Sequence, residues 1–169
     1  MKKAIFLDRD GIINVDHSYV HKSEEFEFNK GIFQVLQHFL SLDYVLFIVT
    51  NQSGIGRGYY SEDDFKKLTS WMINKFTCKD ITIQKVYHCP HHPDEGCKCR
   101  KPKTGMFEKA KKEFDIDMEN SWMIGDKTSD IKAGLNANIT NTIFVNSFTC
   151  KEASFSVKSI LDTIDIIKK

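Results

Sequence analysis

The sequence predicts a three-layer α/β/α fold, in which a mainly parallel β-sheet is covered by helices on both faces. Short apolar runs of β character alternate with longer segments of helical period, and the alternation continues to the C-terminus. The chain has 169 residues, 41% of them hydrophobic, with 9 Gly and 3 Pro, and we find no internal repeat. A chain of this length can bury a core without a second domain. We therefore expect one Rossmann-like domain over residues 1–169, with right-handed connections between its strands.

The elements of the N-terminal half follow from their apolar spacing. Residues 4–7 and 44–49 are short apolar runs, typical of strands that are buried on both faces. Between them, hydrophobic residues recur at helical spacing, namely Ile32, Val35, Leu36, Phe39 and Leu40. Ser61 is an expected helix N-cap, because Asp64 lies three residues further on. We expect the apolar face of the helix after it to pack in the core, through Phe65, Leu68, Met72 and Phe76.

The C-terminal half continues the same alternation. Residues 84–87 form a weaker strand pattern, and a helix is expected to open near Thr104, with apolar positions at Phe107, Ala110 and Phe114. Residues 122–124 and 143–145 predict two further strands, with a helix between them that carries Ile131 and Leu135. A final amphipathic helix is predicted from the spacing of Val157, Ile160, Leu161, Ile164 and Ile167.

Composition and charge exclude several classes of protein. Lys and Arg number 24 against 23 Asp and Glu, for a net charge of +1, which lacks the basic excess that is typical of nucleic-acid binding. The longest apolar run, residues 45–49, is far shorter than the roughly 20 residues that cross a bilayer. The apolar stretch near the start is also too short for a secretory signal. We expect a cytoplasmic protein with neither nucleic acid nor membrane as a partner.

Polar residues follow three of the predicted strands. They are Asp-Arg-Asp-Gly at residues 8–11, Thr-Asn-Gln-Ser at residues 50–53 and Gly-Asp-Lys at residues 125–127. In open parallel sheets, ligands bind beyond the carboxyl ends of the strands. The three segments are therefore expected to converge on one crevice.

The carboxylates of this crevice indicate a metal ion. Asp8, Asp10 and Asp126 would repel one another unless a divalent cation offset their charge. Ligands that are all oxygen atoms suit a hard ion, and we expect Mg²⁺.

With Mg²⁺ present, the two carboxylates after the first strand can divide the work of phosphoryl transfer. Asp8 can attack phosphorus while Asp10 handles protons, since residues two apart in an extended stretch point to the same side. Gly11 permits the close approach of the backbone to a phosphate. Thr50 and Asn51 can donate hydrogen bonds to phosphoryl oxygens, and a lysine would balance the charge of the transition state.

A second group of metal ligands lies between residues 89 and 99. Cys89-x-His91-x5-Cys97-x-Cys99 places four Zn²⁺ ligand types within eleven residues. Spacing alone does not choose the histidine, because His88 and His92 are also available. A zinc ion with four protein ligands is structural, and it would stiffen the loop that precedes residues 100 and 101.

Four segments of the sequence resemble the four motifs of the haloacid dehalogenase superfamily of phosphatases. These segments are residues 6–11, 50–54, 100–102 and 125–126. The similarity covers nearly the whole chain and is weakest after about residue 145. It is most evident at residues 13–21, 50–58 and 89–93.

The resemblance implies a role for each motif residue. Asp8 would form an aspartyl phosphate, and Asp10 would protonate the leaving oxygen and then activate water. Mg²⁺ would be held by Asp8, the backbone carbonyl of Asp10 and Asp126. Thr50 and Lys101 would steady the phosphoryl group.

The resemblance is closest to members that act on a heptose bisphosphate in the synthesis of lipopolysaccharide core or another surface glycan. It therefore implies a sugar bisphosphate as substrate, with Arg100 reading it, and His91 as the zinc ligand. The polar side chains of residues 16–19 suit a polyol. The role of Asp130, where the superfamily often has a further acid, is left open. We expect the substrate to contact Asp16, His17, Ser18, Tyr19, Asn51, Gln52, Ser53, Arg100 and Lys127.

Two alternatives remain. The short gap between His91 and Cys97 resembles histidinol-phosphate phosphatases, whose substrate is cationic, whereas Arg57, Arg100 and Lys127 border the crevice and favour a second anion. The other alternative is a non-catalytic zinc module.

The motif segments leave no room for a separate cap domain, and we expect a monomer.

Overall fold

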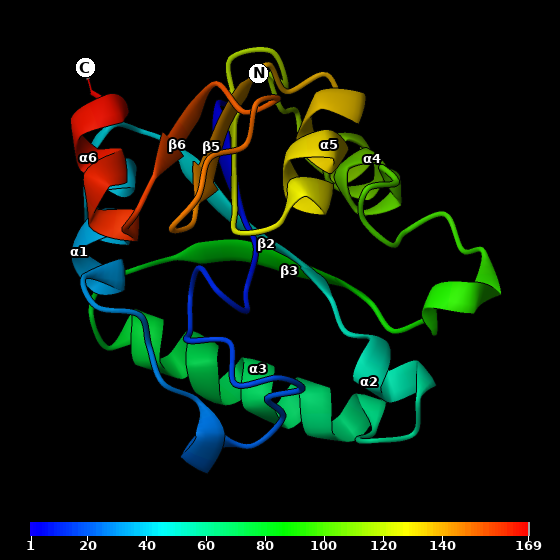
Figure 1. Cartoon of the computed structure of the whole chain (residues 1–169). Helices are drawn as coiled ribbons and strands as arrows, with labels where there is room; N and C mark the ends of the chain where they lie inside the picture. The colour runs from blue at the N-terminus through cyan, green and yellow to red at the C-terminus, as the bar shows by residue number, and fades with distance from the viewer. Residues whose placement is uncertain (169) are drawn as a thin grey trace.

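The computed structural model describes residues 1–168, and its centre is a six-stranded sheet (Figure 1). Every neighbouring pair of strands in it is parallel, and the strand order is β3-β2-β1-β4-β5-β6. The strands are β1 (Ala4–Leu7), β2 (Val45–Asn51), β3 (Ile83–Cys89), β4 (Trp122–Gly125), β5 (Asn141–Val145) and β6 (Phe155–Val157). The predicted three-layer fold with a parallel sheet is confirmed.

Helices cover both faces of the sheet. One buried cluster joins the sheet to α1, α3 and the C-terminal segment, and a second joins its other face to α4 and α5. The helices are α1 (Ile32–Ser41), α2 (Ser53–Gly56), α3 (Glu62–Thr77), α4 (Gly105–Glu113), α5 (Thr128–Asn136) and α6 (Thr163–Ile166). Short 3-10 helices lie at Ser23–Glu25, Pro93–Glu95 and Ile160–Asp162.

Strand β1 shows why this sheet is buried on both sides. All four of its residues are fully buried; Ile5 and Leu7 belong to one core cluster, and Ala4 and Phe6 to the other. This division follows from the alternation of side chains along a strand. The ring of Phe6 stacks on that of Phe47 in β2, with centroids 5.2 Å apart, so the neighbouring strands β1 and β2 also pack through their side chains.

The predicted start of α3 is confirmed. The Ser61 hydroxyl accepts a hydrogen bond from the Asp64 backbone N–H, and the Asp64 carboxylate accepts one from the Ser61 N–H. This capping box satisfies two N–H groups at the start of the helix. The expected core face is buried along the helix, at Phe65, Leu68, Met72 and Phe76.

The prediction of one long C-terminal helix is wrong. Val157 ends strand β6, where it pairs with Val145, and only the short Ile160–Asp162 and α6 segments follow. The Ser159 hydroxyl accepts a hydrogen bond from the Leu161 backbone N–H, and the Ser159 N–H donates to the Asp162 carboxylate. This cap begins a new segment after the strand, which helical spacing alone did not reveal.

The crevice lies where the chain changes direction across the sheet. Strands β1 and β4 are neighbours although they are far apart in sequence, and β2 flanks β1 on the other side. The carboxyl ends of β2, β1 and β4 therefore lie together, at the topological switch point where such sheets bind ligands. Within residues 1–168, the connections on either side of β2 contain only the 3-10 helix Ser23–Glu25, α1, α2, α3 and loops, so no cap domain is inserted there.

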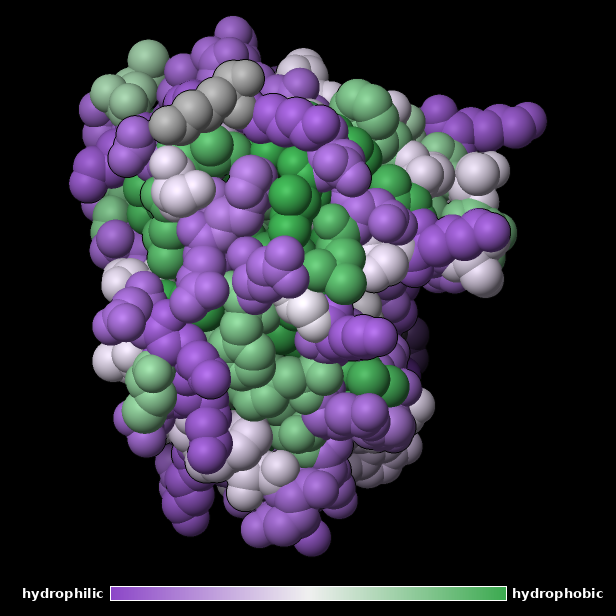
Figure 2. Space-filling view, turned by 90° about the vertical axis from the view of Figure 1, so that its left-hand side faces the viewer, coloured by the Kyte–Doolittle hydropathy of each residue, from purple (hydrophilic) through white to green (hydrophobic). Residues whose placement is uncertain are grey.

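Hydrophobic side chains reach the surface on the side of the molecule that carries α1 and α6 (Figure 2). In and beside these helices, Phe33, Leu161 and Ile164 are only partly buried and pack against the core. None of the helices that the structure describes is both long and apolar enough to cross a membrane.

Candidate active site

Three carboxylates gather at the switch point. Asp8 directly follows β1, Asp126 directly follows β4, and Asp130 lies in the first turn of α5. One oxygen of each lies within 4.8 Å of the others. Asp8 and Asp130 are buried. The predicted meeting of Asp8 and Asp126 is therefore present in the geometry, and Asp130 joins it.

Lys101 places one positive charge inside this acidic cluster. Its Nζ lies 2.7 Å from Asp8 Oδ1 and 2.7 Å from Asp130 Oδ1, and it donates to the Val49 carbonyl at 2.7 Å. Burial disfavours the ammonium ion, but the charges of Asp130 and Asp8 outweigh it and raise the pKa of Lys101. A fully charged lysine therefore stands beside the predicted nucleophile.

One lysine leaves the three acids with excess negative charge. Burial, followed by the charge of Asp130, raises the pKa of Asp8 well above its ordinary value and that of Asp126 to about 6. The buried Oδ1 of Asp126 has no hydrogen-bond partner. An unpartnered carboxylate oxygen in an all-oxygen cluster fits a hard divalent cation such as Mg²⁺.

Gly11 is required for the loop after β1 to pass this cluster. Its φ of +97° lies in the left-handed region, which side chains disfavour. A Cβ atom there would also lie 2.2 Å from Asp126 Oδ2. Only glycine brings the backbone of this loop so close to the carboxylate of Asp126.

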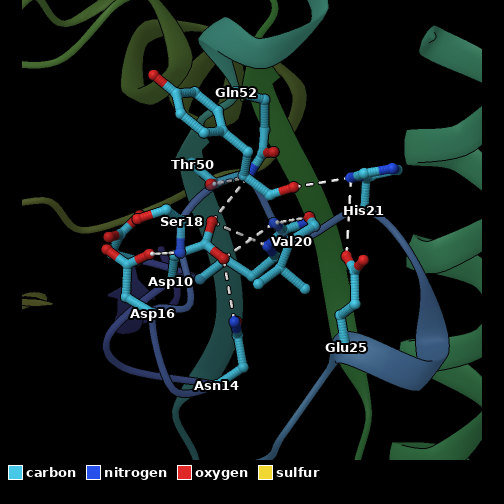
Figure 3. A network of polar contacts seen from close by, with 12 residues as sticks. Asp10, Asn14, Asp16, Ser18, Val20, His21, Glu25, Thr50 and Gln52 are labelled. Atoms are coloured by element: carbon cyan, nitrogen blue, oxygen red, sulfur yellow. Dashed lines mark hydrogen bonds and ion pairs between the residues drawn. The ribbon is translucent and has the colours of Figure 1, made fainter. Parts of the chain in front are cut away.

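The Asp10 carboxyl group accepts hydrogen bonds from three neighbouring side chains (Figure 3). Arg9 donates from Nε at 3.1 Å and from Nη2 at 2.9 Å, and Asn14 Nδ2 and Gln52 Nε2 each donate at 3.0 Å. Arg9 Nη2 also donates to the Val20 carbonyl at 2.8 Å, so it ties residues 9–10 to the loop that lies ahead of α1. The carboxyl group of Asp10 is thus fixed in position near the crevice.

A cavity of about 370 Å³ opens over these carboxylates. Eight of the nine side chains expected to contact substrate line it; His17 does not, and its Nε2 lies 2.8 Å from Glu27 Oε2 in an exposed contact. Arg57 is also absent from the lining. The lining residues are Asp8, Asp10, Asp16, Ser18, Tyr19, Asn51, Gln52, Ser53, Tyr60, Arg100, Lys101, Lys127, Ser129 and Asp130.

The side-chain amides of Asn51 and Gln52, both expected to contact the substrate, bind other residues of the site. The Asn51 side chain accepts a hydrogen bond from the Lys101 backbone N–H at 3.0 Å and donates to the Lys101 carbonyl at 3.3 Å. The Gln52 amide contacts Asp10 and Thr50. Both amides therefore position other residues of the site. Thr50 is fully buried beneath the lining.

The loop of residues 16–19 forms one wall of the cavity. Ser18 and Tyr19 both have left-handed backbones, with φ of 61° and 53°, and the Asp16 carboxylate accepts a hydrogen bond from the Ser18 N–H at 3.0 Å. Across the opening, Lys127 Nζ lies 3.4 Å from Asp16 Oδ2. The edge of the Tyr19 ring meets the ring of Tyr59, with centroids 4.8 Å apart.

Sequence reasoning did not single out Tyr60 and Ser129, and it left the role of Asp130 open. Asp130 was within reach of prediction, because it is the third residue of a helix that starts just after Gly-Asp-Lys. Its Oδ2 accepts a hydrogen bond from the Lys127 N–H at 3.1 Å. Tyr60 could not be predicted from the sequence, because it lies in the loop between α2 and α3, outside the four motif segments.

The predicted zinc ligands converge within the loop after β3. The Sγ of Cys97 lies 3.6 Å from that of Cys89 and 3.7 Å from that of Cys99, and His91 Nδ1 lies 3.5 Å from Cys89 Sγ and 3.2 Å from Cys99 Sγ. A tetrahedral Zn²⁺ site has edges of about 3.8 Å between sulfurs and about 3.5 Å between sulfur and nitrogen. The Cys₃His group therefore has the dimensions of a zinc site.

The other two histidines near this cluster have different partners. His88 Nε2 lies 2.9 Å from Glu62 Oε2, and His92 Nδ1 accepts a hydrogen bond from the Asp94 N–H at 3.2 Å. The geometry thus selects His91. The loop is joined to β2 and α2 as well, because the Gln52 N–H donates to the Cys89 carbonyl and the Gly56 N–H to the Pro90 carbonyl, both at 2.8 Å.

Known proteins resemble this chain in sequence and in fold. Residues 98–158 match a family model described as HAD-hydrolase-like. The chain is 54% identical to D-glycero-alpha-D-manno-heptose-1,7-bisphosphate 7-phosphatase of Campylobacter jejuni, over 99% of this chain and 96% of that relative. It is 44% identical to D-glycero-beta-D-manno-heptose-1,7-bisphosphate 7-phosphatase of Pasteurella multocida, over 99% and 98%.

A solved structure extends the likeness to three dimensions. The crystal structure of D,D-heptose 1,7-bisphosphate phosphatase from B. bronchiseptica, complexed with magnesium and phosphate, matches with a TM-score of 0.87 and 26% identity over 97% of both chains. Fold and motif residues together define a haloacid dehalogenase superfamily protein. Within that superfamily, the chain belongs to the family of D-glycero-D-manno-heptose-1,7-bisphosphate 7-phosphatases.

Proposed function

We propose that this protein hydrolyses the C7 phosphate ester of D-glycero-D-manno-heptose 1,7-bisphosphate through an aspartyl phosphate on Asp8. The observation that carries the proposal is the placement of Asp8. Its carboxylate lies at the floor of a polar cavity, with the Lys101 ammonium at 2.7 Å and a second acid, Asp10, two residues further on. Phosphoryl transfer to a carboxylate requires these three groups: a nucleophile, a positive charge beside it and a second acid that can transfer protons.

Magnesium would be held by Asp8, the backbone carbonyl of Asp10 and Asp126. The unpartnered Oδ1 of Asp126 supports this assignment. When bound, the ion would neutralise the carboxylates and the phosphoryl oxygens, so that the two anions can approach.

Asp8 and Asp10 carry out the bond-breaking and proton-transfer steps. A carboxylate oxygen of Asp8 attacks phosphorus as the bond between phosphorus and the C7 oxygen breaks, and Asp10 gives its proton to that leaving oxygen. Asp10, now a carboxylate, takes a proton from water as the water oxygen attacks the phosphorus and the bond between the Asp8 oxygen and phosphorus breaks. Phosphate leaves, and both aspartates return to their starting states. Lys101 and Thr50 stabilise the charge on the phosphoryl oxygens.

The second phosphate of the substrate would be bound by Arg100 and Lys127. Both side chains line the cavity, and the buried Arg100 Nη1 has no hydrogen-bond partner. A buried guanidinium nitrogen without an acceptor is costly unless an anion completes it. The sugar hydroxyls would meet Asp16, Ser18 and Tyr19, and we leave His17 out of the substrate set because its partner is Glu27.

We assign the Cys₃His cluster to a structural Zn²⁺ held by Cys89, His91, Cys97 and Cys99. Burial opposes ionisation of Cys97, but hydrogen bonds from the Arg100 backbone and from neighbouring sulfurs lower the pKa of its thiol to about 7. A thiolate, the form that binds zinc, is therefore accessible at neutral pH. We further propose that the protein acts as a cytoplasmic monomer in the supply of heptose for lipopolysaccharide core or a surface glycan.

The test is phosphate release from three substrates side by side. Heptose 1,7-bisphosphate is supplied as both C1 anomers, because the relatives divide between the alpha and beta names, and histidinol phosphate is the third. We expect turnover of a heptose bisphosphate, and loss of at least about 1,000-fold in Asp8→Asn with the fold retained by circular dichroism. Preference for histidinol phosphate would overturn the substrate, and a fully active Asp8→Asn variant would overturn the mechanism.

A further inference from the structure

The hydroxyl group of Tyr60 is joined to Asp10 through a single side chain. Tyr60, which is 7% exposed, donates from its hydroxyl to Gln52 Oε1. The Nε2 of the same Gln52 amide donates to Asp10 Oδ2 at 3.0 Å and to Thr50 Oγ1 at 2.8 Å. Gln52 is 2% exposed; its bonds to Tyr60 and Thr50 are buried, and its bond to Asp10 is partly buried at the wall of the cavity.

The bond from Tyr60 and the bond to Asp10 together fix the orientation of the Gln52 amide. The oxygen and nitrogen ends of an amide have nearly the same shape, and only hydrogen-bond partners distinguish them. Burial raises the pKa of Tyr60 to about 12, so the phenol keeps its proton at neutral pH and can donate it. With Oε1 held by Tyr60, both amide hydrogens point toward Thr50 and Asp10. The opposite orientation would place Oε1 against the Asp10 carboxylate.

The Tyr60 ring is held in place from two sides. A Cβ atom on Gly54 would lie 2.1 Å from Tyr60 Cε1, so the ring packs directly on the backbone of α2. On another side, the His21 ring stacks on it, with centroids 5.0 Å apart and an interplanar angle of 4°. His21 Nδ1 lies 2.8 Å from the Tyr19 carbonyl. The phenol is therefore built into the wall of the cavity, between α2 and the loop of residues 16–21.

We propose that Tyr60 is a positioning residue that acts through Gln52 to aim the carboxyl group of Asp10 at the leaving oxygen of the substrate. The proposal rests on the proposed function, because it needs Asp10 as the proton donor. In this role Gln52 orients Asp10 and does not bind the sugar of the substrate. Without the Tyr60 hydroxyl, Gln52 Oε1 loses its donor and the amide can tilt, which weakens one of the hydrogen bonds that fix the orientation of Asp10.

A comparison of two leaving groups tests this role. Expulsion of a sugar alkoxide needs a proton, whereas expulsion of p-nitrophenolate needs almost none. We expect Tyr60→Phe to lower kcat/KM for the heptose bisphosphate by about three- to tenfold, the range expected from one hydrogen bond, and for p-nitrophenyl phosphate by less than about twofold. KM for the heptose bisphosphate should stay unchanged. A general disturbance of the site would lower both rates equally, and that outcome would overturn the proposal.

Two further variants test the route and the specificity. In Gln52→Met, the new side chain has a similar length but no hydrogen-bond donor. If Tyr60 acts through Gln52, the double variant Gln52→Met, Tyr60→Phe should have the same kcat/KM for the heptose bisphosphate as Gln52→Met alone. A further loss in the double variant as large as that of Tyr60→Phe in the wild type would show that Tyr60 does not act through Gln52. Tyr59→Phe is the matched control, because Tyr59 is 56% exposed and retains its ring contact with Tyr19. Equal losses in Tyr59→Phe and Tyr60→Phe would also overturn the proposal.

Thermal unfolding separates these effects from loss of fold, and Gln52→Met supplies the same leaving-group test should Tyr60→Phe unfold. Failure of the wild-type protein on heptose bisphosphate would instead refute the proposed substrate. The same comparison would then use the sugar phosphate that the wild type does hydrolyse, since the role of Tyr60 concerns the leaving oxygen.

Discussion

Replacement of Lys101 by methionine should destabilise the metal-free protein in a strongly pH-dependent way. The Lys101 ammonium is buried and lies 2.7 Å from one oxygen of Asp8 and 2.7 Å from one oxygen of Asp130. Methionine fills much of the same space without the charge. The variant therefore leaves two buried carboxylates without their counter-charge, beside the third carboxylate of Asp126.

The size of the effect follows from the cost of protonating a carboxylate. A buried acid that loses its partner either remains charged, at about 3–5 kcal/mol, or binds a proton. With an unfolded-state pKa of about 3.9, protonation of one carboxylate costs about 4 kcal/mol at pH 7 and about 1.5 kcal/mol at pH 5. In Lys101→Met, the folded state raises the pKa of the carboxyl group that has lost its counter-charge. The free energy of unfolding of the variant is therefore retained at low pH and falls as the pH rises. We expect a loss of about 3–5 kcal/mol at pH 7 and about 1–2 kcal/mol at pH 5.

Urea unfolding in EDTA at the two pH values measures this difference. Lys109→Met, at an exposed position on α4, is the control and should change the free energy of unfolding by less than about 0.5 kcal/mol. The double variant Lys101→Met, Asp130→Asn should recover part of the loss, since one of the two stranded charges is removed. An equal cost for Lys101→Met at pH 5 and pH 7 would refute the electrostatic reasoning.

Three further predictions concern the two metal sites. Gly11→Ala should weaken Mg²⁺ binding and lower kcat by at least about 100-fold, because its Cβ would meet the Asp126 carboxylate at 2.2 Å; Mg²⁺ titration calorimetry that matches wild type would contradict this. The pKa of Asp126 is raised to about 6 by burial, so the Mg²⁺ dissociation constant should rise by at least about tenfold per pH unit below that value; calorimetry from pH 5 to 7.5 measures this, and a dissociation constant that does not change over this range would contradict it. Cys97→Ser should lose its bound zinc, as measured by elemental analysis, and addition of Mg²⁺ alone should not restore its activity. A zinc-free variant that is still active would show that the zinc ion has no structural role.

Much of the fold could be predicted because the strands are buried on both faces. Runs such as residues 4–7 and 45–49 have no polar position, and they stand out from the helical segments between them. The end of the chain was harder to predict. A strand of three residues, Phe155–Val157, has too few positions to show a period of two, and Val157 happens to fall in helical register with Ile160 and Ile164.

The site could be predicted where the chemistry lies directly after a strand, as for Asp8 and Asp126. Sequence reasoning could not tell which polar side chains face the substrate and which face the protein. Asn51 binds the backbone of residue 101, fifty positions away, and Gln52 is oriented by Tyr60 from another loop. Such partners are set by tertiary packing, so polar residues in one motif segment can have different roles.

The two hydrogen bonds between the Asn51 amide and the backbone of Lys101 affect how far the cysteine loop can vary in length. They fix the position of Lys101 independently of the path that the chain takes from His91 to Cys97. Residues inserted between His91 and Cys97 would bulge outward and leave the lysine where it is. A single residue added between Cys99 and Lys101 would instead move the ammonium group out of reach of Asp8. Natural or engineered loop grafts are therefore expected to succeed with longer segments before Cys97 and to fail with any change after Cys99.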